Sequence, residues 1–338
     1  MRQERPPSHC PDARRPVTSD AAPEAVGLLE FLYGISGKQT LAGQHCAPLV
    51  GSTRLVTVHG ATGRYPALFG QDFGFSAAGT WDGINFRQRI VDEAIRRHHE
   101  GFVITLMWHA VPPTRDEPVE FRGGVQSRLS DDEWRELTTP GTGLHGRWRS
   151  QVDVVAWFLR QLREARVPVL WRPYHEMNGR WFWWGGRAGD AGYRALYRML
   201  FERLTGFHGL DNLLWVFNAN ELNEHVGDYA DFYPGDDLVD ILATDVYHSG
   251  FLGEDYDRLL ALGGGRPIAL GEVGALPTVE ILRKQPRWAW FMAWGDVAGR
   301  WHERDAIREL YGSPEVLTHG DLPWVDMDEP RTHYPVLG

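Results

Sequence analysis

Two glutamates stand at the ends of apolar runs, where they could share one chemical task. Glu176 lies within residues 171–185 (WRPYHEMNGRWFWWG), and Glu272 lies within residues 271–274 (GEVG). Two facing carboxyl groups are the minimum equipment for hydrolysis of a glycosidic bond with retention of configuration. One is protonated and gives a proton to the departing oxygen, and the other is ionised and attacks the anomeric carbon.

Aromatic side chains crowd the same parts of the chain. The sequence contains 15 tryptophans; residues 181–184 follow Glu176 closely, and Trp108 and Trp294 end two other apolar runs. Sugar rings have apolar C–H faces that stack on such surfaces, while Asn, His and Arg side chains bind the hydroxyl groups. This composition predicts a carbohydrate ligand.

Eight short runs rich in β-branched and aromatic residues alternate with amphipathic stretches, which is the pattern of βαβ units and a parallel sheet. Eight parallel strands with crossover helices predict a single (β/α)8 TIM barrel of the α/β class. The expected helices include residues 86–99, 148–165, 193–204 and 256–262. The expected strands are residues 40–44, 67–73, 102–108, 167–171, 213–217, 239–247, 267–272 and 288–294.

A doubly wound open sheet is the alternative fold. Such a sheet usually has a glycine-rich phosphate loop after its first strand, and residues 41–51 (LAGQHCAPLVG) do not fit that pattern. The three glycines at 263–265 come before a strand, so they predict a helix-to-strand turn. The barrel is therefore the favoured fold.

Active sites of TIM barrels form at the C-terminal ends of the strands. Glu176 follows the fourth expected strand and Glu272 ends the seventh, so the two would face each other across the mouth of the ring. Residues 111–147 form a long loop after the third strand, which we expect at the same face. Other polar residues leave the strands at this end: His109, Arg172, His175, Asn218, Asn220, Asp245 and Tyr247.

Charge and cysteine content limit the remaining classes. The 338 residues carry 35 lysines and arginines against 45 aspartates and glutamates; the net charge of −10 argues against nucleic-acid binding through phosphate contacts. No apolar run is long enough to predict a membrane span. With two cysteines and no HExxH motif, we expect neither a metal site nor a cofactor.

The first 20 residues are polar and proline-rich, and they lack the apolar core of a signal peptide. We expect residues 1–20 to form a flexible tail and residues 21–338 to form the catalytic barrel. The sequence alone favours a cytoplasmic location, and it leaves export and oligomeric state open.

Residues 171–185 resemble the acid/base segment of family 26 glycoside hydrolases, the β-mannanase family. The segments LAGQH (41–45), ITLMWH (104–109) and LSDDEWRELTTPGTGLHGRW (129–148) are similar to that family too, as is the glutamate after the seventh strand. The resemblance runs from about residue 28 to about residue 323. It implies a TIM barrel and a retaining hydrolase, and most of the family acts outside the cell.

The resemblance also implies roles for individual residues. Glu176 would be the general acid/base and Glu272 the nucleophile. Tyr247 would hydrogen-bond the nucleophile, and Arg172 would anchor the same side of the mouth. The other implied contacts with the sugar come from His109, His175, Trp181, Asp245 and Trp294, and Trp108 joins them by its position at a strand end.

These features predict an endo-acting retaining hydrolase of β-1,4-mannosidic linkages in mannan, galactomannan or glucomannan. The first alternative is the same chemistry on mixed-linkage β-glucan or β-1,3-xylan, because loops decide whether the axial 2-hydroxyl of mannose is accepted. A non-catalytic polysaccharide-binding barrel is a second alternative, and the presence of both glutamates argues against it. A metal-dependent barrel hydrolase is a third, and the His-x-His pair that it needs at the first strand is missing.

Overall fold

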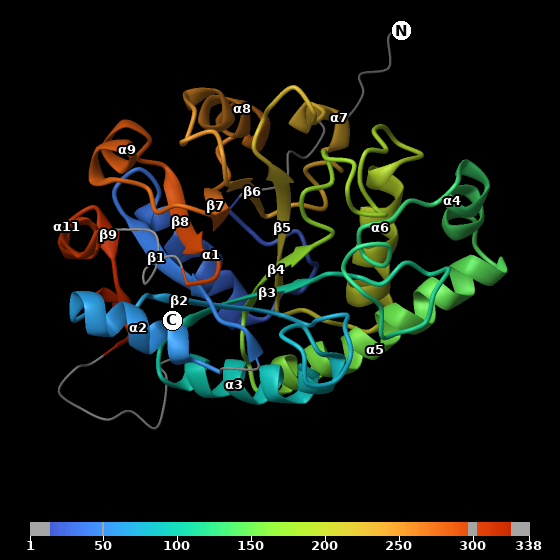
Figure 1. Ribbon diagram of the computed structural model, residues 1–338, viewed down its shortest axis with the longest axis horizontal. Coiled ribbons are helices and arrows are strands. Elements are labelled where there is room, and N and C mark those ends of the chain that lie inside the picture. The colour runs from blue at the N-terminus through green and yellow to red at the C-terminus, as the bar shows by residue number, and fades with distance from the viewer. Residues whose placement is uncertain (1–13, 49–50, 297–302, 326–338) are drawn as a thin grey trace, which may run out of the picture.

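The computed structural model describes residues 14–48, 51–296 and 303–325. Eight parallel strands follow the order β2-β3-β4-β5-β6-β7-β8-β1, and a further pairing of β1 with β2 closes the ring. Figure 1 shows these strands at the centre, with helices around them. The strands are β1 (Thr40–His45), β2 (Leu68–Asp72), β3 (Val103–Trp108), β4 (Val169–Pro173), β5 (Leu213–Asn220), β6 (Ile241–Val246), β7 (Ile268–Val273) and β8 (Trp288–Ala293).

The predicted TIM barrel is confirmed, and each of the eight expected runs contains a strand of the barrel. The bounds differ by a few residues. Strand β4 begins at Val169 instead of residue 167, and β5 continues to Asn220 instead of ending at residue 217. A short strand that the sequence pattern did not predict, β9 (Val316–Leu317), pairs with the start of β1.

The helices cover the outside of the ring. Helix α5 buries the face that the spacing of residues 152–162 predicted, with Val152, Val155, Leu159 and Leu162 all in the core. Within the described residues, none of the helices is both long and apolar enough to span a membrane. The helices are α1 (Pro23–Ile35), α2 (Thr53–Thr62), α3 (Arg87–His99), α4 (Asp131–Thr138), α5 (Gly143–Glu164), α6 (Tyr193–Phe201), α7 (Tyr229–Phe232), α8 (Gly253–Gly263), α9 (Val279–Lys284) and α11 (Arg304–Gly312).

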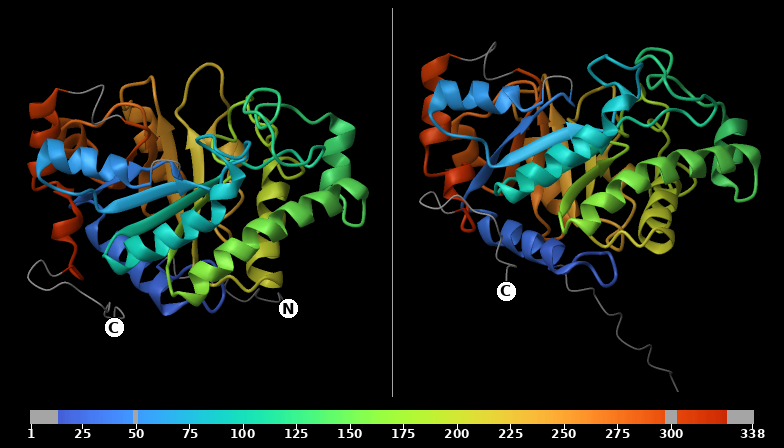
Figure 2. Two further views of the ribbon diagram at one scale, coloured as in Figure 1. Left: turned by 60° about the horizontal axis from the view of Figure 1, so that its bottom comes forward. Right: turned by 90° about the horizontal axis from the view of Figure 1, so that it is seen from below.

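Helix α1 closes one end of the barrel. Figure 2 shows it below the strands, and its Leu28, Leu29 and Leu32 belong to one buried cluster with Leu170 of β4 and Trp290 of β8. Trp290 is fully buried. The end of the barrel covered by α1 is filled with apolar side chains. The polar site residues of the strands lie at the opposite, C-terminal end.

The predicted N-terminal tail ends earlier than residue 20. The backbone N–H of Val17 donates a hydrogen bond to the Asp240 carboxylate at 2.7 Å, and Thr18 is buried. Asp240 directly precedes β6, so this contact holds the chain at the N-terminal end of the barrel. Residues 1–13 of the expected tail, and residues 49–50, 297–302 and 326–338 of the expected barrel, lie outside the described residues.

The segment expected to be a long loop, residues 111–147, contains helix α4 and the first turn of α5. Figure 2 shows α4 projecting from one side of the barrel. Its start is specified locally, because the Ser130 hydroxyl accepts from the Glu133 N–H at 3.2 Å while the Glu133 carboxylate accepts from the Ser130 N–H at 2.7 Å. This reciprocal capping box satisfies two backbone donors at the helix N-terminus.

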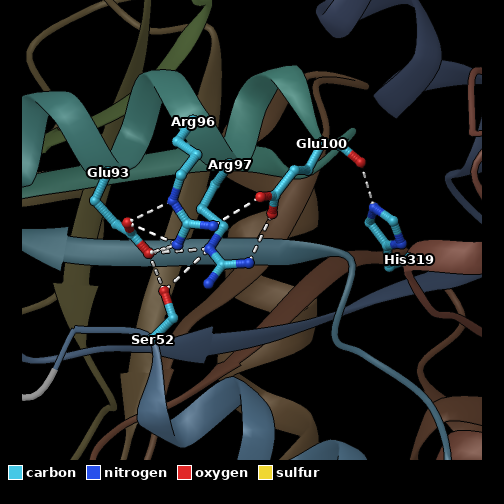
Figure 3. A network of polar contacts seen from close by, with 6 residues as sticks. All are labelled: Ser52, Glu93, Arg96, Arg97, Glu100 and His319. Atoms are coloured by element: carbon cyan, nitrogen blue, oxygen red, sulfur yellow. Dashed lines mark hydrogen bonds and ion pairs between the residues drawn. The ribbon is translucent and has the colours of Figure 1, made fainter. Parts of the chain in front are cut away.

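A polar network attaches helix α3 to two neighbouring elements (Figure 3). Arg97 donates to the Ser52 hydroxyl, which lies just before α2, at 3.0 Å and to Glu93 at 3.0 Å. At the end of α3, the Glu100 carbonyl oxygen lies 2.7 Å from Nε2 of His319, close to the end of the described chain. The contact of Glu100 with His319 joins residues that are 219 positions apart in the sequence.

Gly43 of β1 is a position where the barrel has no room for a side chain. A Cβ there would lie 2.7 Å from the Phe291 carbonyl oxygen and 2.8 Å from Cδ2 of Leu68. We expect Gly43→Ala to lower the unfolding free energy by about 1–3 kcal/mol, as overpacking typically does. Thermal denaturation measures the effect. The control is Gly60→Ala in helix α2, where a Cβ would meet nothing within 4 Å. Equal melting temperatures for the two variants would contradict the prediction.

Candidate active site

Glu272 lies at the C-terminal end of β7 and is the most tightly held of the two predicted carboxyl groups. Its side chain is 3% exposed. Its Oε1 accepts a hydrogen bond from Nη2 of Arg172 at 2.7 Å, and its Oε2 accepts one from the Tyr247 hydroxyl at 2.6 Å. Both carboxylate oxygens therefore have a donor, and one of the donors is a cation.

Arg172 connects four strands. From β4 it donates through Nε to Oδ1 of Asn218 on β5 at 2.6 Å, and through Nη2 to Asp245 on β6 at 3.3 Å as well as to Glu272 on β7. The guanidinium is 1% exposed, so its charge is balanced by these partners and not by solvent. Burial raises the pKa of the Asp245 carboxyl, and the negative charge of Glu272 raises it further, while Arg172 opposes both effects.

Two glycines make room for this arrangement. A Cβ on Gly271 would collide with Oδ1 of Asn218 and would lie 2.7 Å from Oδ1 of Asp245. A Cβ on Gly274 would lie 2.7 Å from Cδ1 of Tyr247. Gly271 and Gly274 therefore lie on either side of Glu272 at positions where a side chain would collide with Asn218, Asp245 or Tyr247.

Glu176 lies three residues beyond β4 in a left-handed backbone conformation, with φ of 54°. Its backbone N–H donates to the Asn218 carbonyl oxygen at 2.8 Å, and its Oε2 accepts from Nε1 of Trp181 at 2.7 Å. Burial and the negative charge of Glu272 raise the pKa of Glu176 to about 7, although the Trp181 hydrogen bond acts in the opposite direction. A non-glycine residue held in this conformation is typical of functional sites.

The aromatic residues after Glu176 form a wall beneath it. The indole N–H of Trp184 donates to the His175 carbonyl oxygen at 2.8 Å, and that of Trp183 donates to the Ala110 carbonyl oxygen at 2.8 Å. Both tryptophans are buried, whereas Trp181 is partly exposed. Trp108 is 1% exposed and packs beside Tyr174, with ring centroids 6.1 Å apart, so the structure places it in the core next to the wall.

Two histidines meet edge to face beside the wall and have opposite electrostatic environments. The rings of His109 and His175 have centroids 4.5 Å apart. Burial opposes the charged form of His109, but the Asp72 carboxylate, 2.6 Å from Nδ1, outweighs this and raises the His109 pKa. Burial lowers the pKa of His175 well below its usual value, and the charges of His109 and Arg172 lower it further.

A third aromatic contact lies on the opposite side of the ring of strands. Trp294, directly after β8, stacks on His45 at the end of β1 with centroids 3.8 Å apart. Nη1 of Arg54 donates to the His45 carbonyl oxygen at 3.2 Å. Trp294 is thus held as a partly exposed platform at the C-terminal end of the barrel.

The ten predicted site residues lie on β3, β4, β6, β7 and β8 or in the segments that follow these strands, but Trp108, which was expected to contact the sugar, is packed in the core. Sequence reasoning did not select Asp72, His45 or Glu221. Each of these ends or directly follows a strand, so the rule that found the others also covers them. Asn218 and Asn220 end β5, and Asn218 contacts Arg172.

His175, Asp245 and Glu272 could in principle hold a metal ion, since one potential ligand atom from each lies within 4.8 Å of the others. Arg172 argues against this, because its guanidinium already donates to both carboxylates. A metal cation would have to share the two oxygens with a buried positive charge. The donor set therefore fits an arginine better than an ion.

A hollow of about 700 Å³ opens beside Trp181. Asn178 connects its two walls by donating to the carbonyl oxygens of Asn220 at 2.9 Å and Gly227 at 3.3 Å. This volume lies within the range of small-molecule sites. The lining residues are Arg180, Trp181, Glu224, His225, Val226 and Gly227.

Two carboxyl groups at the C-terminal end of a TIM barrel, one following β4 and one on β7, fit the class of glycoside hydrolases. The chain belongs to glycosyl hydrolase family 26, whose family model matches residues 17–321.

Proteins similar to this chain come from bacteria, fungi and a protist. The structure of GH26A from Muricauda sp. MAR_2010_75 has a TM-score of 0.87 at 43% identity, and the match covers 90% of this chain and 99% of that chain. A β-mannanase from a symbiotic protist of the termite Reticulitermes speratus, complexed with a gluco-manno-oligosaccharide, has a TM-score of 0.80 at 26% identity and covers 92% and 98% of the two chains.

A mannan endo-1,4-β-mannosidase of Thermothelomyces thermophilus is 34% identical over 322 residues. The match covers 91% of this chain but 63% of that protein, so the chain spans less than two thirds of that relative's length.

Opposite shifts in the Glu176 pKa are expected from two substitutions. Glu272→Gln removes the charge that raises the pKa, so the pKa should fall; Trp181→Phe removes the hydrogen bond that lowers it, so the pKa should rise. Carboxyl ¹³C NMR of glutamate-labelled protein measures both, and Glu176→Gln identifies the resonance. Shifts in the same direction in both variants would contradict the assigned causes.

Proposed function

We propose that this protein is a retaining endo-β-1,4-mannanase that cleaves internal linkages of mannan, galactomannan or glucomannan. The observation that carries the proposal is the contrast between the two glutamates. Glu176 has a pKa of about 7 and is thus available as an acid, whereas Glu272 is paired with Arg172 and Tyr247. Double displacement requires one carboxyl group that gives a proton and a second one that attacks the anomeric carbon.

In the first step, Oε of Glu272 attacks the anomeric carbon while Glu176 gives its proton to the glycosidic oxygen, and the chain on the leaving side departs as an alcohol. A glycosyl ester to Glu272 results. The ester carries no negative charge, which removes one of the two main causes of the raised Glu176 pKa. Glu176 is then a carboxylate that takes a proton from water. The oxygen of this water attacks the anomeric carbon, the bond from that carbon to Oε of Glu272 breaks, and the sugar leaves with Glu272 restored as a carboxylate.

The groups around Glu272 suit recognition of a neutral, hydroxyl-rich ring. Among the described residues, the buried polar atoms without a hydrogen-bond partner include Nδ1 of His175 and Oδ2 of Asp245 at the C-terminal end of the barrel. We assign both to sugar hydroxyls, together with His109. Trp294 supplies the apolar face on which the same ring stacks.

The leaving-side sugar has a separate place. Trp181 donates to the proton-giving Glu176 and also lines the hollow of about 700 Å³, so the departing oxygen and the hollow lie on the same side of the acid. We assign the hollow to the sugar units that depart in the first step. An endo-acting enzyme needs such a place, because its leaving group is itself a chain.

Substrate choice is tested by a reducing-sugar assay on galactomannan, glucomannan, mixed-linkage β-glucan, β-1,3-xylan and cellulose. We expect activity on the two mannans and a β-configured first product by proton NMR. Activity on β-glucan or xylan alone would overturn the substrate, and an α-configured first product would overturn the mechanism. Absence of activity across the panel from folded protein would overturn the proposed function.

Replacing Glu176 should slow the cleavage of substrates whose leaving group needs a proton more than the cleavage of substrates whose leaving group does not. We expect Glu176→Ala to lower kcat on mannan by about 10²–10⁴-fold, the usual contribution of general acid–base catalysis. A dinitrophenyl β-mannobioside needs no proton, so it should still give a burst of phenolate. Azide should then restore turnover and yield a β-mannosyl azide, because azide attacks the ester without a base.

The control is Glu254→Ala, an exposed glutamate on α8 that pairs with Arg258 and should leave kcat unchanged. Labelling with a 2-fluoro-mannosyl inactivator followed by mass spectrometry should identify Glu272 as the nucleophile. A label on another residue, or full mannan activity of Glu176→Ala, would contradict the assignments.

A further inference from the structure

Glu221 is a buried carboxylate for which the chemistry described so far has no use. It follows the last residue of β5 and is 2% exposed. Its Oε1 accepts from the backbone N–H groups of Tyr247 at 3.0 Å and His248 at 2.7 Å, and its Oε2 accepts from that of Ser249 at 2.7 Å. Within the described residues, no lysine or arginine forms an ion pair with it. Three consecutive backbone donors thus converge on one anion.

Residues 247–249, whose backbone N–H groups donate to Glu221, lie beyond the end of β6 and are not paired with a neighbouring strand. Strand β6 ends at Val246, where its register with β7 also ends. The register shifts between Thr244 and Asp245, a bulge that changes the direction of the residues that follow. The backbone N–H of Tyr247 therefore has the Glu221 carboxylate as its partner in place of a neighbouring strand.

Tyr247 is also the residue that reaches the nucleophile. Its hydroxyl donates to Oε2 of Glu272 at 2.6 Å, and its ring lies over Gly274. Tyr247 therefore connects the two glutamates: its backbone N–H donates to Glu221, and its hydroxyl donates to Glu272. Glu221 also connects to the strand itself, because its own N–H donates to the Asp245 carbonyl oxygen at 2.9 Å.

We propose that Glu221 is a positioning residue for the nucleophile: it holds the Tyr247 backbone so that the phenol keeps its hydrogen bond to Glu272. The role of Glu272 in this statement rests on the proposed function. Because the Glu221 carboxylate accepts hydrogen bonds from the backbone of residues 247–249 and reaches Glu272 only through Tyr247, its removal should slow the attack of Glu272 and leave sugar binding unchanged.

The test compares Glu221→Ala, which removes both acceptor oxygens and all three hydrogen bonds, with Glu221→Gln, which keeps one acceptor oxygen. We expect kcat on mannan to fall by about 10- to 100-fold in Glu221→Ala with KM unchanged, since misplacement of a reacting group by about 1 Å costs a factor of this size. Glu221→Gln should show a smaller loss of kcat, and it serves if the alanine variant does not fold.

Asp240 offers a matched control at the opposite end of the barrel. It too is a carboxylate that is 2% exposed and accepts two backbone N–H groups, those of Val17 and Trp215, each at 2.7 Å. Asp240→Asn should lower the melting temperature and leave kcat and KM unchanged. If the Glu221 variants also change only the melting temperature, the positioning role is wrong and Glu221 is structural.

A double-mutant cycle separates action through Tyr247 from an independent effect. If Glu221 acts through the phenol, combining Glu221→Gln with Tyr247→Phe should lower kcat no further than Tyr247→Phe alone. Losses that multiply would overturn the proposal.

A crystal structure of Glu221→Gln gives a readout that does not depend on the substrate. The distance between the Tyr247 hydroxyl and Oε2 of Glu272 should exceed hydrogen-bonding range. An unchanged distance would overturn the positioning role, whereas an inactive wild-type protein would overturn the proposed function alone.

Discussion

The ion pair between Arg172 and Glu272 is the interaction on which the mouth of this barrel depends. A guanidinium that is 1% exposed would be strongly unfavourable without partners, so the surrounding strands must supply them. Asn218, Asp245 and Glu272 do so from β5, β6 and β7, and Gly271 leaves the space in which they approach. The closed parallel sheet brings these residues to one level although 100 positions separate Arg172 from Glu272 in the sequence.

The same charges make the two glutamates different. Glu272 receives a cation and a phenol, while Glu176 receives one indole N–H and lies close enough to Glu272 to be affected by its charge. One carboxyl group thus raises the pKa of the other. The two histidines follow the same principle, since Asp72 favours the charged form of His109 while burial keeps His175 neutral.

Local pattern was sufficient for the strands of the barrel. The apolar runs predicted all eight barrel strands, and polar residues at the strand ends predicted where the site would form. The predicted tail of residues 1–20 extended too far, because the contact of Val17 with Asp240 joins residues more than 200 positions apart. Asp72, His45 and Glu221 were not selected, because the partner of each comes from another strand and is evident only in the tertiary structure.

The sequence by itself determined the order of strands and helices, the end of the barrel at which chemistry is placed and the family to which the segment 171–185 points. Periodicity and strand ends are local properties, and each can be seen in a few consecutive residues. Only the tertiary structure decided what raises the pKa of Glu176. Burial and the charge of a carboxylate from a distant strand set that value, and both exist only after the barrel closes.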